Sequence, residues 1–575
     1  MTATIAFTPT PIDVDEFDAP ASQLPSATTT APRVDVVDLN QFADDHQTLH
    51  KINFVVEPGE IVAIAGGSGA GKSTLLEAMA GIRPAASGWV LVNGEEMTAD
   101  SQIVESGFVP QEDIIHTELP LRRTLEHAAA LRLPPGSSRA EIDAAVKRTL
   151  ARLDLDNRDD VAVSDLSGGQ RKRASIAAEL LADPQLFFLD EPTSGLDPAT
   201  AAEVMHQLRR LADSGTSIIL TTHSPADICK ADKVVFLARD GHLAFVGSPG
   251  AAADYFDVED FIDAYAHLAA APDPAALTTE FIESPWGKAV TPSASAWPRV
   301  EPTRSGRPRW SRLSQWRSLT RRNVDLVLRN KLTLAILLGS PTMVVGMMAV
   351  LFRPGTFDAD QASALPAVQT LFWVAFASFF FGLTYGLLQI VGEFAIFKRE
   401  RFSGVSVTSY VASKLAVLTP LVAVVNVVML GILRGLDRLP ANSWANWASL
   451  TVTLVLISMA ALSMGLLASA AVQNPAQATL ALPMLCFPQI LFAGAVVPVT
   501  EMAAAGRLLS FGLADRWGFE ALGRTFDLDV QVGANATTAG YADAFTGSVT
   551  TGWLVLAAIT SLSLVGTVAT LRRRS

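Results

Sequence analysis

The sequence is poor in cysteine and has more acidic than basic residues. Its 575 residues include two cysteines, Cys229 and Cys486, and carry a formal net charge of −13. Because the two cysteines lie in different predicted domains, they imply neither a disulfide framework nor a metal site, and we interpret both as free buried thiols. The negative charge argues against nucleic acid as the main partner.

The start of the chain lacks the apolar segment of a secretory signal. Residues 1–32 are acidic and rich in Thr, Pro and Ala. We therefore predict a disordered tail over residues 1–33 and a first domain that stays in the cytoplasm, where it is made. Phosphorylation of the threonine-rich stretches 8–10 and 28–30 is the alternative to a plain flexible tail.

Long apolar runs are absent up to about residue 329 and frequent from residue 332 onward. The chain is too long for one compact domain, and its mean hydropathy of +0.31 is high for a soluble protein. The change in composition predicts a soluble domain followed by a membrane domain.

The soluble part is predicted to be an α/β domain over residues 34–269. Residues 61–65, 186–189 and 217–220 are short apolar runs separated by helical stretches. Short apolar runs of this kind are typical of strands in a sheet that is covered on both faces.

A linker and a connecting helix are predicted between the two domains. Residues 270–309 are rich in Pro, Ala, Ser and Thr, as linkers are. Residues 310–330 place tryptophans and basic residues at helical spacing, which predicts a helix lying in the membrane interface. A soluble surface helix is the alternative.

The membrane domain, residues 331–575, is predicted to be all-helical with six spans, each long enough to cross ~30 Å of hydrocarbon. The predicted spans are 332–352, 366–391, 409–431, 447–472, 476–498 and 551–571. Basic residues at 398–401 and at 572–574 place both chain ends in the cytoplasm, and the protein in the cytoplasmic membrane as a multi-pass chain. Arg434 and Arg438, on the predicted outer side, count against this orientation.

A phosphate-binding loop follows the first of the apolar strands. The loop residues are Gly66, Gly67, Ser68, Gly69, Ala70, Gly71, Lys72, Ser73 and Thr74. The glycines let backbone N–H groups wrap the phosphates, and the following helix adds its dipole. Lys72 is predicted to reach the β- and γ-phosphates and Ser73 to hold Mg²⁺. The pattern therefore predicts a nucleotide, ATP, bound with Mg²⁺.

An acidic pair ends the apolar strand at 186–189. Asp190 is placed to bind Mg²⁺, and Glu191 to polarise the attacking water. An acidic pair at a solvated strand end is the alternative.

Between these motifs, residues 166–171 read Leu-Ser-Gly-Gly-Gln-Arg and resemble the signature of the ATP-binding-cassette family. Gln111, residues 194–197 and His223 follow the family's order as well. The resemblance implies contacts to ATP held on an opposite subunit by Ser167, Gly168, Gly169 and Gln170. It also implies roles within the chain's own site. There, Gln111 and Asp190 would complete the Mg²⁺ and water shell, Glu191 would act as general base, and His223 would contact the γ-phosphate. Phe42 stands where family members stack an aromatic on adenine, and a core Phe is the alternative.

The chain resembles in particular the G subfamily of half-transporters. Residues 167–180, 190–200, 393–401 and 491–498 look like that subfamily's motifs, and so does the order of the two domains. Ser224 after the switch histidine and Pro198 after Asp197 depart from its usual pattern. These departures and the Ala- and Val-rich composition suit a bacterial, actinobacterial member.

The resemblance implies a type-2 exporter kind of membrane domain and a dimer, since one chain carries one half of each composite ATP site. We expect a homodimer; a heterodimer with a paralogue is the alternative. Ion pairs of Glu393, Glu400 and Arg401 are expected to transmit force between the domains, a solvated loop being the alternative. The implied function is ATP-driven export of a hydrophobic or lipid-linked substrate, with membrane lipid as a partner. An importer half and an ATP-gated signalling or mechanical device are the competing hypotheses.

The second span also carries a dense set of aromatic residues. They are Phe372, Trp373, Phe376, Phe379, Phe380, Phe381 and Tyr385. They are expected either to line an apolar substrate cavity or to pack against lipid and protein.

Overall fold

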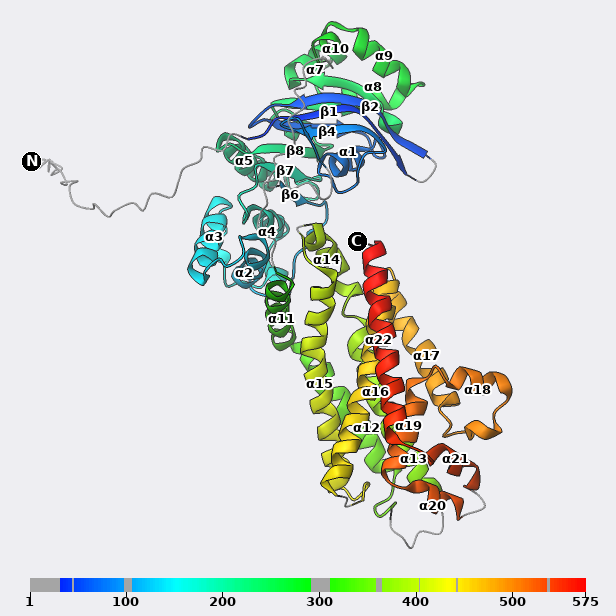
Figure 1. Ribbon diagram of the computed structural model, residues 1–575. Helices are drawn as coiled ribbons and strands as arrows, with labels where there is room; N and C mark the ends of the chain where they lie inside the picture. The colour runs from blue at the N-terminus through cyan, green and yellow to red at the C-terminus, as the bar shows by residue number, and fades with distance from the viewer. Residues whose placement is uncertain are drawn as a thin grey trace, which may run out of the picture.

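The computed structural model describes residues 31–43, 46–97, 106–290, 311–357, 364–402, 404–440, 443–534 and 538–574. These residues form an α/β part and a helical part, joined by helix α11 (Arg312–Arg329) (Figure 1). Residues 1–30 of the predicted tail and 291–309 of the predicted linker lie outside the described residues.

The α/β part contains a six-stranded sheet whose strand order is β10-β9-β3-β8-β7-β6. The strands are β3 (Ile61–Gly66), β6 (Ser106–Val109), β7 (Leu186–Leu189), β8 (Ser217–Thr222), β9 (Lys233–Leu237) and β10 (Leu243–Gly247). All neighbours are parallel except β10, which is antiparallel to β9. The predicted apolar runs are therefore three central strands, β3, β7 and β8. In β3, Val62 and Ile64 join one apolar core while Ile61 and Ala63 join another, so both faces are covered.

A second, antiparallel sheet has the order β2-β1-β4-β5. Its strands are β1 (Val34–Ala43), β2 (His46–Val56), β4 (Ser87–Val92) and β5 (Glu95–Glu96). Helices α1 (Lys72–Met79), α2 (Leu121–Arg132), α3 (Arg139–Arg152), α4 (Gly168–Leu180), α5 (Pro198–Asp213), α6 (Pro225–Ile228), α7 (Pro249–Phe256) and α8 (Phe261–Ala270) complete the α/β part. Cys229 is exposed and Cys486 is buried, and both are free. The prediction of two buried thiols is thus wrong for Cys229, which directly follows the short helix α6 at the surface.

The first half of the predicted linker is helical and belongs to the α/β part. Helices α9 (Pro274–Glu283) and α10 (Pro285–Val290) pack on β10, and the ring of Phe281 lies 5.6 Å from that of Phe245. Helix α11 then occupies the predicted connecting segment and packs against α2 and α15, with Leu319 fully buried.

After α11, the helical part contains the helices α12 (Lys331–Leu351), α13 (Leu365–Leu387), α14 (Phe394–Phe402), α15 (Val407–Gly435), α16 (Trp444–Ala471), α17 (Pro475–Phe492) and α22 (Val549–Arg574). Among the described residues, five helices are long and apolar enough to cross a membrane: Leu365–Arg401, α15, α16, α17 and α22. The first predicted span coincides with α12, which has 21 residues. The fifth predicted span ends early, at Phe492, because the chain leaves the helix before Gly494.

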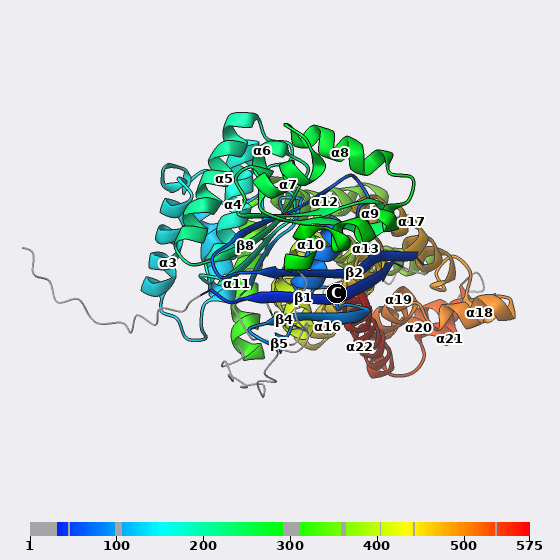
Figure 2. The same cartoon turned by 90° about the horizontal axis from the view of Figure 1, so that it is seen from above.

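Four short helices lie between the last two spans: α18 (Ala504–Ser510), α19 (Ala514–Thr525), α20 (Leu528–Gly533) and α21 (Ala542–Phe545). Helix α19 packs against α13, α16 and α22. Seen from above, α18, α20 and α21 project to one side of the α/β part (Figure 2).

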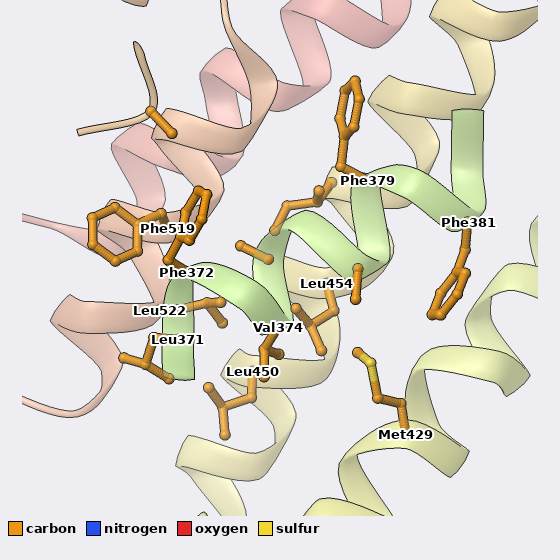
Figure 3. Packing of buried hydrophobic residues seen from close by; sticks show 14 of the residues in the cluster. Leu371, Phe372, Val374, Phe379, Phe381, Met429, Leu450, Leu454, Phe519 and Leu522 are labelled. Carbon is orange, nitrogen blue, oxygen red and sulfur yellow. The ribbon is translucent and has the colours of Figure 1, made fainter. Parts of the chain in front are cut away.

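Helix α13 is the centre of the helical part's apolar core. A Cβ atom on Gly382 would lie 2.2 Å from the carbonyl oxygen of Ser458, so glycine allows α13 to touch α16. Phe379 and Phe381 are fully buried and point to opposite sides of α13, and Phe372 lies near Phe519 of α19 (Figure 3). These aromatic side chains therefore pack inside one protomer, and Trp373 is the more exposed exception at 37%.

Candidate functional site

The phosphate-binding loop runs from the end of β3 into α1. Gly71 has φ of +86°, and a Cβ atom there would lie 2.8 Å from the carbonyl oxygen of Thr48, so both its backbone and its surroundings require glycine. Lys72 folds over the loop and donates to the carbonyl oxygens of Gly66 (3.0 Å) and Gly67 (2.9 Å). Burial lowers the pKa of Lys72, while the carboxylates of Glu191 and Asp190 act in the opposite direction.

The hydroxyl and the carboxylate predicted to hold Mg²⁺ lie together. The Oγ of Ser73 donates to Oδ1 of Asp190 at 3.0 Å, and the Oγ1 of Thr221 donates to the same oxygen at 2.6 Å. Oxygen donors and few protein ligands suit Mg²⁺, which keeps other positions for water and phosphate. Ser73 and Asp190 therefore fit the ion.

Three side chains predicted for catalysis also meet at the end of β7. Gln111 Nε2 donates to Oε2 of Glu191 at 3.0 Å, and Nδ1 of His223 lies 3.5 Å from Oε1 of Glu191. Glu191 has a φ of 45°, in the left-handed region that non-glycine residues seldom adopt, and such strain concentrates at functional sites. Its backbone N–H donates to Thr221 Oγ1 at 2.8 Å.

Thr221 is the residue of this site that the sequence analysis missed. It holds both Asp190 and Glu191, from the neighbouring strand β8. Since β7 and β8 are parallel and Leu189 pairs with Leu220, the residue after Leu220 had to lie beside the acidic pair. The strand order, which the sequence analysis did not predict, was the information needed to find it.

The signature residues begin helix α4. Ser167 is its N-cap and forms a capping box with Gln170, which satisfies two backbone N–H groups. Gly169 faces α5, where a Cβ atom would lie 2.2 Å from Cγ2 of Thr200. Helix α4 packs against α2, α3, α5 and β6, whereas α1 packs against β2, β3 and β8. Figure 1 accordingly shows the signature helix apart from the chain's own phosphate-binding loop.

A lysine of the signature helix is tied to the Gln111 loop. The Nζ of Lys172 donates to the carbonyl oxygens of Gln111 (2.8 Å) and Pro110 (3.3 Å). Burial lowers the pKa of Lys172, and the charge of Asp113 opposes that shift. Movement of α4 and movement of Gln111 are thereby linked within one protomer.

Phe42 lies in β1 opposite Gln47 and is 47% exposed, so it is not a core residue. The next residue of β2, Thr48, lies against Gly71 of the loop. The position of Phe42 is thus near the phosphate-binding loop, and its contact with adenine stays a prediction.

The α/β part and the helical part meet through buried charges around α14. The guanidinium of Arg399 donates to the carbonyl oxygen of Ile114, and its Nε lies 3.5 Å from Oε1 of Glu179. Arg322 of α11 is ion-paired with Glu400.

The expected ion pairs are therefore present for Glu393, which pairs with Lys414, and for Glu400. The prediction for Arg401 is wrong, because its guanidinium donates to the carbonyl oxygen of Val405, 3.3 Å away in the same loop. Arg399, two residues earlier in α14, makes the contact to the α/β part instead.

Comparison with known proteins agrees with this geometry. Residues 49–194 match the ABC transporter family, and residues 314–522 match the ABC-2 type transporter family. The chain is 33% identical over 502 residues to the ABC transporter ATP-binding/permease protein Rv1747 of Mycobacterium tuberculosis, covering 84% of this chain and 56% of that protein. It is 37% identical over 214 residues to Protein white of Drosophila melanogaster, covering 35% of this chain and 31% of that protein.

Among solved structures, cbiO1 from Clostridium perfringens, part of the ABC transporter complex cbiONQ, is 28% identical. That match covers 40% of this chain and 93% of the other, with a TM-score of 0.36. The chain thus spans little more than half the length of the mycobacterial relative and about a third of Protein white.

Proposed function

We propose a function for this chain from the premise that it belongs to the ABC transporters, with an ABC-2 type membrane domain after its ATPase domain. It is a bacterial half-transporter of the G type that uses ATP hydrolysis to export a hydrophobic or lipid-linked substrate across the cytoplasmic membrane. The meeting of Gln111, Glu191 and His223 beside the Ser73–Asp190 pair is the observation that carries this proposal.

Hydrolysis begins with a water held by Gln111 and Glu191 beside the γ-phosphate. As the water oxygen bonds to phosphorus, its proton passes to the Glu191 carboxylate, and the bond from phosphorus to the β–γ bridging oxygen breaks. ADP and phosphate leave. Lys72 turns from the carbonyl oxygens of Gly66 and Gly67 toward the phosphates, and His223 donates to the γ-phosphate. Ser73 and Asp190 would hold Mg²⁺, which would neutralise phosphate charge when bound.

A second copy of the chain supplies the other half of each ATP site. The separation of α4 from the chain's own loop supports this, since Ser167 and Gly169 then serve ATP on the partner. Helix α17 supports it as well, because it exposes a helical stripe of large apolar side chains at spacings of four, three and four. These are Leu480 (69% exposed), Met484 (75%), Phe487 (62%) and Leu491 (52%). A stripe of this kind fits a second copy or lipid.

Closure of the ATPase domains reaches the membrane helices through α14. Ile114 follows Gln111 by three residues and accepts from Arg399, so a shift of the Gln111 loop acts directly on α14. The C-terminal Arg574, 4.5 Å above the ring of Phe394, lies at the same end of the bundle (Figure 1). This supports an orientation with the ATPase domain and both chain ends in the cytoplasm.

The substrate class follows from the apolar membrane domain and the resemblance, and not from an aromatic cavity in α13. Most of those aromatic side chains pack within the protomer. A lipid or lipid-linked molecule that enters from the bilayer is the cargo we propose.

An ATP hydrolysis assay tests the proposal. The purified chain and its Glu191→Gln variant are compared in lipid vesicles, with a panel of native lipids added. Lipid-stimulated hydrolysis that disappears in the variant supports export. Hydrolysis without a response to any lipid would instead favour an ATP-gated signalling or mechanical device that moves no cargo. Absence of hydrolysis in both forms would contradict an active homodimer.

A further inference from the structure

A cavity of about 300 Å³ lies where the ATPase domain meets the membrane helices. Its walls come from the loop at 115–118 of the ATPase domain, from α11 and Asn330 after it, from the turn between α13 and α14, from Ile396 of α14, and from α15. The nucleotide site has no part in this lining, and neither does the exposed stripe of α17.

One polar group of the lining lacks a hydrogen-bond partner. His116 is 7% exposed, and its Nε2 is buried without a partner among the described residues. Burial lowers the pKa of His116 well below its usual value, and the charge of Arg322 acts in the same direction. The imidazole is therefore neutral at pH 7 and can donate to or accept from one polar group of a ligand. An unsatisfied buried polar atom costs about 1–3 kcal/mol, which a ligand would recover.

The charges around the lining suit an uncharged head group. Glu393 and Lys414 are ion-paired with each other, and Lys414 Nζ also donates to Oδ1 of Asn323 at 3.2 Å. Glu118 adds an exposed carboxylate. Arg322 and Lys414 disfavour a cation beside His116, and the described residues of the lining hold no free cation to pair with an anion, so a charged head would be buried at a cost that a hydroxyl avoids.

The rest of the lining mixes polar and apolar side chains. Thr117, Asn330 and Gln389 are polar, and Leu326 and Val327 of α11, with Leu388, Val417 and Leu418, supply apolar surface. The volume of the cavity stands at the lower end of the roughly 300–1,000 Å³ found for ligand sites, which suits one short chain and not a two-chain lipid.

We propose that this cavity binds a small single-chain amphiphile with a hydroxyl head, the head on His116 and the chain along Leu326 and Val327. The ligand contacts both domains, and His116 follows Gln111 by five residues. Its occupancy therefore adjusts the contact between the Gln111 loop and α14 and changes the rate of hydrolysis. That regulatory effect rests on the proposed function, whereas binding does not.

Photolabelling tests the binding. The full chain in phosphatidylcholine nanodiscs is exposed to dodecanol bearing a diazirine in its chain, or to the matched dodecanoic acid, and labelled peptides are located by mass spectrometry. We expect saturable labelling by the alcohol of peptides holding residues 115–118 or 326–327. Leu326→Trp fills the cavity and should lower this labelling at least about tenfold, equivalent to 1.4 kcal/mol of binding. Leu328→Trp is the matched control, since Leu328 is 64% exposed on the same helix.

Val417→Phe fills the cavity from α15 and repeats the test if Leu326→Trp does not fold. Equal labelling by the acid, unchanged labelling in both filled variants, or labelling spread evenly over the apolar helices would overturn the proposal. Labelling needs no ATP hydrolysis, so its failure is distinct from failure of the transporter proposal. A change in hydrolysis rate with dodecanol in the wild type, absent in Leu326→Trp, would establish the regulatory effect, and no change in the wild type would refute it.

Discussion

Arg399, in the membrane domain, donates a hydrogen bond to the carbonyl oxygen of Ile114 in the ATPase domain. Its guanidinium also lies 3.5 Å from Glu179, which accepts from Arg132 at 2.5 Å. Helix α4, which carries the signature at its start, includes Glu179. One buried arginine thus touches the loop after Gln111 and the helix of the signature, the two elements that we propose respond to ATP.

Replacement of this arginine should uncouple the domains. Arg399→Ala removes both contacts without touching the nucleotide site, so we expect basal ATP hydrolysis within about twofold of wild type and loss of its stimulation by lipid. Lys398→Ala is the control, because Lys398 is exposed on the same helix. Normal stimulation in Arg399→Ala would show that coupling takes another route.

Removal of the proposed general base should abolish turnover but not binding. Glu191→Gln keeps the hydrogen bond from Gln111 possible while removing the proton acceptor, and we expect hydrolysis to fall about 10²–10⁴-fold. Phosphate release and binding of a fluorescent ATP analogue measure the two effects. Glu203→Gln, at an exposed site of α5, serves as control. Hydrolysis close to wild type in Glu191→Gln would assign the base elsewhere.

The hydroxyl of Ser73 should affect ATP hydrolysis by binding Mg²⁺. Because Ser73 lies 3.0 Å from Asp190, Ser73→Ala removes one of the proposed protein ligands. We expect the Mg²⁺ concentration needed for half-maximal hydrolysis to rise about tenfold or more, and excess chelator to stop hydrolysis in the wild type. An unchanged Mg²⁺ dependence would count against this ligand assignment.

Replacing only one partner of the buried Arg322–Glu400 ion pair should destabilise the fold. Arg322 is 2% exposed and Glu400 7%, so removing either leaves a buried charge unpaired, at a cost of about 3–5 kcal/mol. Arg322→Met and Glu400→Gln should each lower the midpoint of thermal unfolding, and the double variant should lose much less than the sum. Additive losses would show that the two side chains do not interact.

Two neighbouring glycines of the signature should differ in their tolerance of a methyl group. Gly169→Ala places Cβ 2.2 Å from Thr200, whereas a Cβ on Gly168 meets no atom within 4 Å. We expect Gly169→Ala to lower the thermal unfolding midpoint and Gly168→Ala to leave it within error. Thr200→Ala should restore much of the loss, and failure to do so would locate the strain elsewhere.

The local motifs of the site could be predicted from sequence because each is a strand end or a helix start. The loop from Gly66 to Thr74 and the Asp190–Glu191 pair belong to single segments with their own chemistry. Thr221 and Arg399 could not be predicted, since their roles come from partners 31 and 285 residues away. Long-range partners depend on the order of strands and on how the two domains dock.

Two features of the fold could not be decided from the sequence, for physical reasons. Pro274 and Pro285 made residues 270–309 resemble a linker, yet proline is also favoured in the first turn of a helix, and both begin one here. The aromatic residues of α13 were ambiguous because a membrane protein's core and its lipid-facing surface are equally apolar. Only packing against α16 and α19 distinguishes the two.

Lipid movement in vesicles tests the central claim most directly. The chain is reconstituted with its ATPase domain outward, together with the native lipid that best stimulates hydrolysis, in fluorescent form. We predict ATP-dependent transfer of that lipid to the inner leaflet, lost in Glu191→Gln and in Arg399→Ala. Hydrolysis in the wild type with no ATP-dependent transfer of any lipid tested would contradict the account.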